Sequence, residues 1–247
     1  MRSWRREVGV RAISPESYFR RKRQWSIHPR IIQLNWIRFT MPCKEQIISD
    51  VIMVPPMVSK RMTQLPMVAQ LKTGRSVIVE YMTERQLSET YCMIQEAALY
   101  GEGYGIDEFE SEEEFRMEIK NSDCFAITCK ESGCLLAAFI IAVSKFYRGQ
   151  NAMADPFIIV KRSERQQSLG EFALRMAIDF ATCLGYIGMY VDTFSSNTAI
   201  LKIVEKIGGF QQVGILPVGG KLPNGQIVSS IIFIKYLPMS RDSMKLT

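Results

Sequence analysis

A strand that runs into a helix through a short polar loop carries the strongest chemical signal in this 247-residue sequence. The apolar run Phe157–Val160 is followed by Arg165-Gln166-Gln167-Ser168-Leu169-Gly170, and a helix is expected from about Leu169 to Leu184. Unpaired amides at the helix start, together with the helix dipole, would bind a phosphate or pyrophosphate group, and Arg165 would add a cation. Ordinary helix capping by small residues such as Ser168 is the competing interpretation. The loop is not a Walker motif, because Gly-x-x-x-x-Gly-Lys-Ser/Thr is absent.

A second strand and helix follow in the order and spacing of a known family. Met189-Tyr190-Val191-Asp192 leads to Asn197-Thr198-Ala199 and then to Glu205-Lys206-Ile207-Gly208-Gly209-Phe210. Together with the loop after Val160, these segments resemble the GCN5-related N-acetyltransferase (GNAT) family, whose acetyl-CoA loop is written Arg/Gln-x-x-Gly-x-Gly/Ala. Ser168 stands where that family usually has glycine, and the closing segment has one extra glycine. The resemblance covers about residues 76–237.

The resemblance implies both a fold and a cofactor. The fold would be a central mixed, splayed β-sheet flanked by helices, with acetyl-CoA as co-substrate in a cleft beside the Phe157–Val160 strand. The pantetheine arm would pair with main-chain groups there as a pseudo-strand, and the pyrophosphate would lie on the loop amides. The implied cofactor-binding residues are Ile158, Ile159, Val160, Arg165, Gln166, Gln167, Ser168, Leu169, Gly170 and Asn197.

Direct transfer is the mechanism that the resemblance implies. A deprotonated amine would attack the thioester, a main-chain amide would stabilise the oxyanion, and a carboxylate would remove the amine's proton. We expect Asp192 to be this base, because a strand holds it rigidly beside the cleft; Asp155, before the cofactor strand, is another candidate. The family often has a tyrosine acid seven residues beyond the Asn, where this chain has Val204. Solvent or a different donor would then protonate the thiolate, and a non-catalytic cofactor-binding module is an alternative.

An acidic segment between the first two predicted helices borders the acceptor site in this family. Residues 102–114 contain seven acidic residues and no Lys or Arg. The resemblance implies that Glu102, Tyr104, Asp107 and Glu108 bind the acceptor, and the negative field would attract a cationic molecule. A solvated helix start favoured by the helix dipole is the alternative interpretation. We therefore predict acetyl transfer to the primary amine of a small molecule, with protein amines as the alternative acceptor.

The hydrophobic periodicity predicts the elements that must position these residues. Thr83 with Gln86, and Ser111 with Glu114, have the pattern of capping boxes, and Glu131-Ser132-Gly133 indicates a hairpin turn. Their order predicts one mixed α/β domain over residues 75–240. Strands are expected at 76–81, 124–130, 135–145, 157–160, 189–193, 210–216 and 228–237, and helices at about 84–99, after Ser111, at 169–184 and at 198–207.

The positive charge of the chain is concentrated before this domain. Residues 1–75 carry 15 Lys and Arg against 4 Asp and Glu, whereas residues 76–247 carry 16 against 21. Prolines between 40 and 74 interrupt any long helix, so residues 1–74 are predicted to be a basic leader followed by a Pro/Met-rich linker. The leader fits a mitochondrial transit segment, a nucleic-acid patch or an arm with no specific role. Since the domain is mildly acidic, nucleic acid is not the expected partner.

Composition argues against several other classes of protein. The sequence has no run of about 18 uncharged apolar residues, so no membrane partner is expected. Six scattered cysteines, no Cys-x-x-Cys pair and the single His28 argue against a disulfide scaffold and against a metal site. Reduced thiols and an intracellular, cytoplasmic location are expected, with the mitochondrion as the alternative. The oligomeric state does not follow from the sequence.

Overall fold

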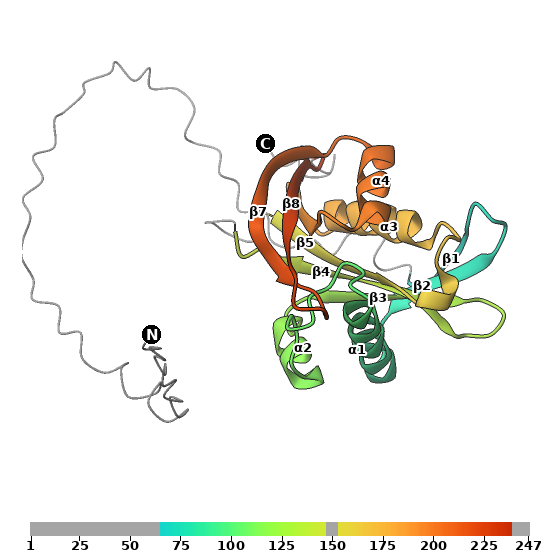
Figure 1. Cartoon of the computed structure of the whole chain (residues 1–247). Coiled ribbons are helices and arrows are strands. Elements are labelled where there is room, and N and C mark those ends of the chain that lie inside the picture. The colour runs from blue at the N-terminus through green and yellow to red at the C-terminus, as the bar shows by residue number, and fades with distance from the viewer. Residues whose placement is uncertain (1–64, 147–152, 239–247) are drawn as a thin grey trace, which may run out of the picture. The chain divides into compact units, whose positions relative to one another are not determined.

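The computed structural model describes residues 65–146 and 153–238, so most of the predicted leader lies outside the described residues. An eight-stranded sheet with the spatial order β1-β2-β3-β4-β5-β6-β8-β7 organises this part of the chain (Figure 1). The predicted mixed α/β class is confirmed, because four helices flank the sheet in the described residues. In chain order the elements are β1 (Met67–Gln70), β2 (Ser76–Tyr81), α1 (Glu84–Leu99), α2 (Glu112–Glu118), β3 (Asp123–Cys129), β4 (Leu135–Val143), β5 (Met153–Val160), α3 (Leu169–Cys183), β6 (Gly188–Phe194), α4 (Thr198–Ile207), β7 (Gln211–Lys221) and β8 (Ile227–Tyr236).

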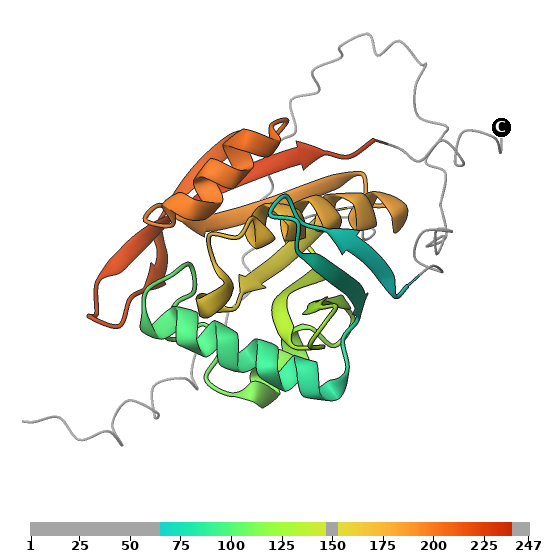
Figure 2. The ribbon, with the colours of Figure 1, turned by 90° about the vertical axis from the view of Figure 1, so that its right-hand side faces the viewer.

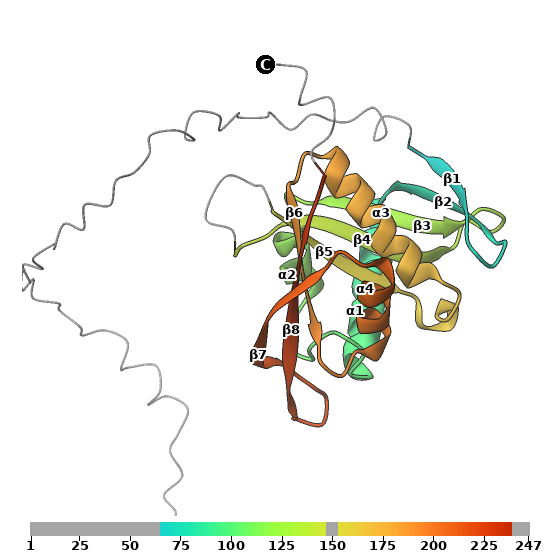
Figure 3. The same ribbon diagram turned by 90° about the horizontal axis from the view of Figure 1, so that it is seen from above.

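The sheet opens between β5 and β6, which are its parallel neighbours. Every other neighbouring pair of strands is antiparallel. Within the described residues the β5–β6 ladder consists of two residue pairs, Met153 with Gly188 and Ala154 with Met189. Beyond these pairs the two strands separate, so the predicted splay is confirmed (Figure 3). The carboxyl-terminal half of β5 is thereby left with main-chain groups that β6 does not pair.

Helices cover both faces of the sheet. α3 and α4 lie on one face, and α1 and α2 lie on the other (Figures 1 and 2). Phe180 of α3 packs edge-on against Phe125 and Phe139 of the sheet, with ring centroids 4.8 and 5.6 Å apart. Because both faces are covered, β4 is buried along Leu135–Ile141 and has a continuous apolar sequence instead of an alternating one.

The predicted helix starts are also found in the structure. Thr83 and Gln86 form the full capping box of α1: the Thr83 hydroxyl accepts from the Gln86 amide at 3.3 Å, and the Gln86 side chain accepts from the Thr83 amide at 2.8 Å. For α2, the Ser111 hydroxyl accepts from the Glu114 amide at 3.1 Å. The Glu114 carboxylate, however, accepts from the amide of Glu110 instead of completing the box at Ser111.

The sequence interpretation is wrong for the last residues of the predicted linker. Met67–Gln70 is an edge strand paired with β2, and Leu71 is 4% exposed in the core. A strand of only four residues after Pro66 has too few residues to show a period, so the pattern gave no signal. Two other strands are longer than expected: β5 begins at Met153 rather than 157, and β7 continues to Lys221.

Candidate active site

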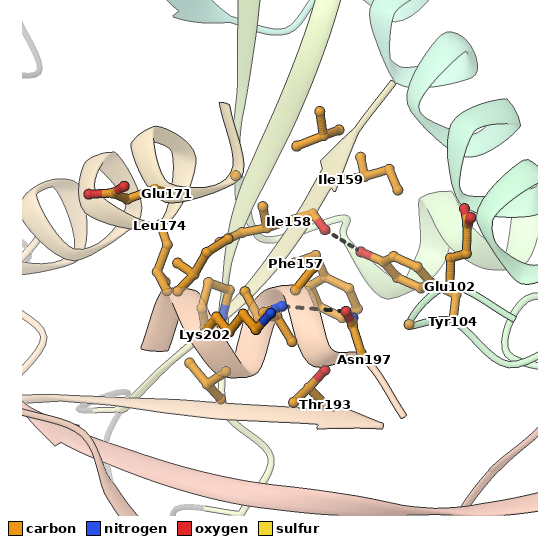
Figure 4. A pocket seen from close by; sticks show the side chains of 18 of the residues that line it. Glu102, Tyr104, Phe157, Ile158, Ile159, Glu171, Leu174, Thr193, Asn197 and Lys202 are labelled. Carbon is orange, nitrogen blue, oxygen red and sulfur yellow. Dashed lines mark hydrogen bonds between the residues drawn. The ribbon is translucent and has the colours of Figure 1, made fainter. Parts of the chain in front are cut away.

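A cleft of about 920 Å³ lies where β5 and β6 separate. Its walls are the second half of β5, the loop that leads into α3, the start of α4, and the Gly101–Tyr104 segment after α1 (Figure 4). Of the ten predicted cofactor-binding residues, nine line this cleft. The exception is Gln167, whose side chain turns to Arg75. Residues far apart in the sequence therefore meet at one opening of the sheet.

The backbone of the loop between Val160 and Leu169 could hold an anion. Gln166 and Ser168 have positive φ angles of 63° and 65°, so left-handed residues alternate with ordinary ones. Such an alternation turns successive N–H groups toward one point. Ser168 is the N-cap of α3, yet its side chain makes no capping hydrogen bond. Since the first amides of a helix have no intrahelical acceptor, this geometry favours the anion interpretation over ordinary capping.

Residues near the N-terminus of the domain brace this loop. Arg75 donates to the carboxylate of Glu164 at 2.5 Å and to the side chain of Gln167 at 3.4 Å. Arg165 turns back toward β5, where its Nε donates to the Val160 carbonyl at 3.4 Å. The turn between β1 and β2 therefore supports the loop directly, which is a second reason to count residues 67–75 as part of the domain.

Glu171, in the first turn of α3, gathers three cations at the edge of the cleft. Its carboxylate pairs with Lys72 at 2.6 Å, Lys206 at 2.7 Å and Arg175 at 3.0 Å. Hydrogen bonds from Lys206 and then Lys72 lower the pKa of Glu171 to about 2. The sequence pattern does not predict this cluster. Only Glu171 and Arg175 show a signal, their i,i+4 spacing, whereas Lys72 comes from another part of the chain.

Two carboxylates line the opposite end of the cleft. Asp155 lies within β5 rather than before it, and Asp192 lies on β6. Burial raises the pKa of Asp155 to about 7, and the charge of Asp192 adds to the shift. The pKa of Asp192 is also raised, mainly by desolvation, although the hydroxyl of Tyr190, 3.5 Å away, opposes this. The Tyr190 ring packs against that of Phe146, with ring centroids 4.8 Å apart, and both residues line the cleft together with the acids.

Of the four residues predicted to bind the acceptor, only Glu102 and Tyr104 line the cleft. Glu102 and Tyr104 contact the cofactor side: Glu102 pairs with Arg165, and the Tyr104 hydroxyl donates to the Ile158 carbonyl at 3.0 Å. Glu108 accepts a hydrogen bond from the Gly105 amide at 2.9 Å. Burial raises the pKa of Glu108, and the charge of Asp192 adds to this shift. Asp107 is exposed, and neither Asp107 nor Glu108 lines the cleft.

Much of the acidic segment is engaged in local structure. Glu112 accepts from Ser88 at 2.7 Å and from Arg116 at 2.8 Å, and Glu114 accepts from the Glu110 amide. These contacts support the interpretation of a helix start for residues 110–114. Of this segment's acids, Glu102 alone lines the cleft. Asp155 and Asp192, which are 37 positions apart in the sequence, come together there from two strands of the sheet.

Asn197 and Val204 show what α4 contributes. The Asn197 side chain accepts from the Ile200 amide at 3.4 Å and caps α4 at the edge of the cleft. Gly103 passes so close to Asn197 that a Cβ on this glycine would clash with its amide. Val204 is 3% exposed and belongs to the core under α3 and α4. Val204, which stands where the family often has a tyrosine acid, is not among the cleft-lining residues.

Comparison with known proteins places this geometry in a class. The model of the acetyltransferase (GNAT) family matches residues 87–210, which is half of the chain. No match to a curated protein was found. The chain therefore belongs to the GNAT acetyltransferase family, whose members use acetyl-CoA as co-substrate.

Solved structures show the same fold. A GCN5-related N-acetyltransferase from Kribbella flavida is 18% identical, with a TM-score of 0.57 over 65% of this chain and 98% of the other. The ribosomal-protein-S18-alanine N-acetyltransferase from Escherichia coli is 21% identical, with a TM-score of 0.53 over 66% of this chain and 96% of the other. A phosphinothricin acetyltransferase from Sinorhizobium meliloti, solved with acetyl-CoA, is 14% identical, with a TM-score of 0.58 over 67% of this chain and 91% of the other. At these identities the likeness shows the fold alone.

Two absences hold for the described residues, 65–146 and 153–238. Within them, no helix combines the length and apolar character needed to cross a membrane. The same residues contain no group of three or more His, Cys, Asp or Glu side chains placed to hold a metal ion.

Proposed function

We propose that this protein transfers the acetyl group of acetyl-CoA to the primary amine of a small cationic molecule. One observation carries the proposal: a single cleft has, at one end, a loop with two left-handed residues that leads into α3 and, at the other, the carboxylates of Asp155 and Asp192. Family membership accounts for acetyl-CoA. The pair of acids accounts for an acceptor that arrives as an ammonium ion.

The loop and β5 together offer acetyl-CoA a continuous set of partners. The pyrophosphate would lie on the amides of residues 166–170, where the left-handed residues and the start of α3 aim N–H groups at one point. The pantetheine arm would run along Ile158–Val160, whose main chain β6 leaves unpaired. This direction carries the thioester toward the acids. A main-chain N–H of β5 would then stabilise the oxyanion.

Asp192 is the proposed general base, and Asp155 its partner in attracting the amine. An ammonium group must lose a proton before it attacks, and a base works best when its pKa is raised toward the working pH. Desolvation raises the pKa of both carboxyls. Phe146, which lines the cleft and is largely exposed, would favour a cation at the face of its ring that Tyr190 leaves open.

A small acceptor fits the enclosure of this end better than a long peptide. Between α1 and α2 the chain crosses to the tip of the β7–β8 hairpin, where the Ile106 amide donates to the Lys221 carbonyl at 2.9 Å. On the same side, Gly101 lies against Leu222. These contacts restrict the path that an extended peptide would take beside the acids.

The leaving thiolate requires no phenol from α4. A thiol with a pKa of about 8.5 is a good leaving group, and the side chain at position 204 is an aliphatic core residue. Protonation by solvent completes the reaction.

A thiol-release assay tests the proposal with the full chain, acetyl-CoA, and two acceptor panels, small diamines and basic peptides. We expect release of free CoA with small amines, and a fall of about 100-fold in kcat for Asp192→Asn, the low end of the range for loss of a general base. Asp179→Asn, an exposed acid on α3, is the matched control and should change nothing. Faster turnover with peptides would shift the proposal to protein amines. Tight acetyl-CoA binding with no turnover on either panel would favour a non-catalytic module.

A further inference from the structure

The segment Gly101–Ile106, which we call the strap, crosses the cleft from the end of α1 to the β7–β8 hairpin. Along its length it contacts the anion loop through Glu102, α4 through Gly103, β5 through Tyr104 and the hairpin through Ile106. Figure 4 shows Glu102 and Tyr104 on the side of the cleft that faces β5. The strap therefore touches the elements that acetyl-CoA is proposed to contact.

Glu102 makes the contact that conflicts with a bound anion. Its carboxylate pairs with the guanidinium of Arg165 and lies 3.4 Å from that of Arg162. Arg162 is itself held over the ring of Tyr100, 3.5 Å from the ring centre. The Glu102 and Arg165 side chains are both 30% exposed, so the pair is partly shielded from water. In the free protein, the Glu102 carboxylate is therefore paired with Arg165, the cation that the loop would offer to a pyrophosphate.

We propose that Glu102 is an internal competitor of the acetyl-CoA pyrophosphate, and that exchange of one anion for the other at Arg165 sets the affinity for the cofactor. This inference rests on the proposed placement of the pyrophosphate on the loop. Arg165 forms one favourable bidentate pair at a time, so it releases Glu102 when it takes the pyrophosphate. The carboxylate must then move away, since two anions at one guanidinium repel each other.

The exchange also affects the rest of the strap. Gly103 and Tyr104 follow Glu102 directly, and they contact Asn197 and Ile158. The Ile158 carbonyl, which accepts the Tyr104 hydroxyl, lies on the stretch of β5 proposed for the pantetheine arm. Release of Glu102 therefore loosens the strap where the cofactor needs main-chain partners.

The opposite role for Glu102 makes a different prediction. If the carboxylate held Arg165 in the orientation that binds pyrophosphate, removing its charge would weaken cofactor binding. If it competes, removing its charge strengthens binding. The sign of the change therefore decides between the two roles.

Calorimetric titration of the full chain with CoA measures this sign without any acetyl transfer. We expect Glu102→Gln to bind CoA about 3- to 5-fold more tightly, the range for losing a partly exposed competing ion pair, and the gain should shrink in high salt. Glu113→Gln removes the same charge from an exposed position on α2 and is the matched control, with a change below about 2-fold. In an Arg165→Gln background, Glu102→Gln should no longer strengthen binding, because the shared cation is gone.

The outcomes separate this inference from the proposed function. Weaker or unchanged binding by Glu102→Gln overturns the competitor role, and so does an equal gain from Glu113→Gln. A gain that persists without Arg165 overturns it as well. If no form of the protein binds CoA, the proposed function and this inference fail together. If Glu102→Gln tightens binding in a protein that acetylates no amine, the competitor role stands and the proposed function alone is refuted.

Discussion

Replacing Ser168 by aspartate should separate the stability of the free protein from its affinity for acetyl-CoA. Ser168 is the N-cap of α3, and its side chain makes no capping bond there. A carboxylate at a helix start interacts favourably with the helix dipole, by about 0.3–1 kcal/mol. The same carboxylate would stand among the amides proposed to bind the pyrophosphate. We therefore expect Ser168→Asp to be folded and as stable as the unmodified protein, yet unable to bind acetyl-CoA well.

The loss of affinity can be worked out from charge and distance. Two like charges about 4 Å apart repel by about 4 kcal/mol at the effective dielectric constant of a protein surface. A loss of about 3 kcal/mol, after some screening, weakens binding by roughly 100-fold. At acetyl-CoA 100 times its dissociation constant, the unmodified protein gains about 2.7 kcal/mol. At the same concentration the variant gains about 0.4 kcal/mol.

Thermal unfolding with and without acetyl-CoA measures this difference. For a domain of this size, 1 kcal/mol corresponds to about 2–4 °C, so the cofactor shift should fall from about 5–10 °C to about 1 °C. Ser168→Asn is the control, because asparagine tolerates the left-handed conformation and carries no charge. Position 168 suits the test better than Gly170, where a new Cβ would press on Ile203 at 3.1 Å. A full cofactor shift in Ser168→Asp would show that the pyrophosphate does not lie on this loop.

Three further perturbations follow from the same contacts. A chain starting at residue 76 should unfold more readily than one starting at residue 65, by about 2 kcal/mol or more in denaturant titration, because it lacks β1 and the buried Leu71; equal stability would show that β1 is dispensable. Glu171→Gln should cost about 1.5–3 kcal/mol at pH 7 by removing hydrogen bonds from charged groups. The pKa of Glu171 is lowered to about 2 in the folded protein, from about 4.5 in the unfolded chain, so the stability that its carboxylate contributes is complete above pH 4.5 and is lost as the pH falls toward 2. The free energies of unfolding of the two proteins should therefore converge near pH 2. A difference independent of pH would contradict the charge pairing. Val204→Tyr should destabilise by about 1–3 kcal/mol through overpacking without raising turnover, and a stable, faster variant would place this side chain near the sulfur after all.

The loop and its flanking elements could be predicted from sequence because their signals are local. The strand that ends at Val160, the small residues before Leu169 and the helix after Asn197 lie within single stretches of chain, and the structure places them at one cleft. The capping residues Thr83 and Ser111 were identified for the same reason. Even so, the left-handed φ at Gln166 and Ser168 gave no sequence signal, since neither residue is glycine.

The rest of the site depends on tertiary pairing that no local pattern records. Asp155 and Asp192 meet because β5 and β6 are parallel neighbours at their starts, and Lys72 reaches Glu171 across 99 positions. The family resemblance implied that Glu102 binds the acceptor, but its contacts are with Arg165 and Arg162. Composition showed that an acidic field is present, and only the fold shows which carboxylates face the cleft.

The acetylated product formed from an amino alcohol tests the central claim most directly, because that acceptor offers an amine and a hydroxyl in one small molecule. The full chain would be incubated with acetyl-CoA and the amino alcohol, and the product identified by tandem mass spectrometry. We expect acetylation on nitrogen, with the rate reduced in Asp192→Asn. An O-acetylated product, or N-acetylation that proceeds equally well without the Asp192 carboxylate, would contradict it.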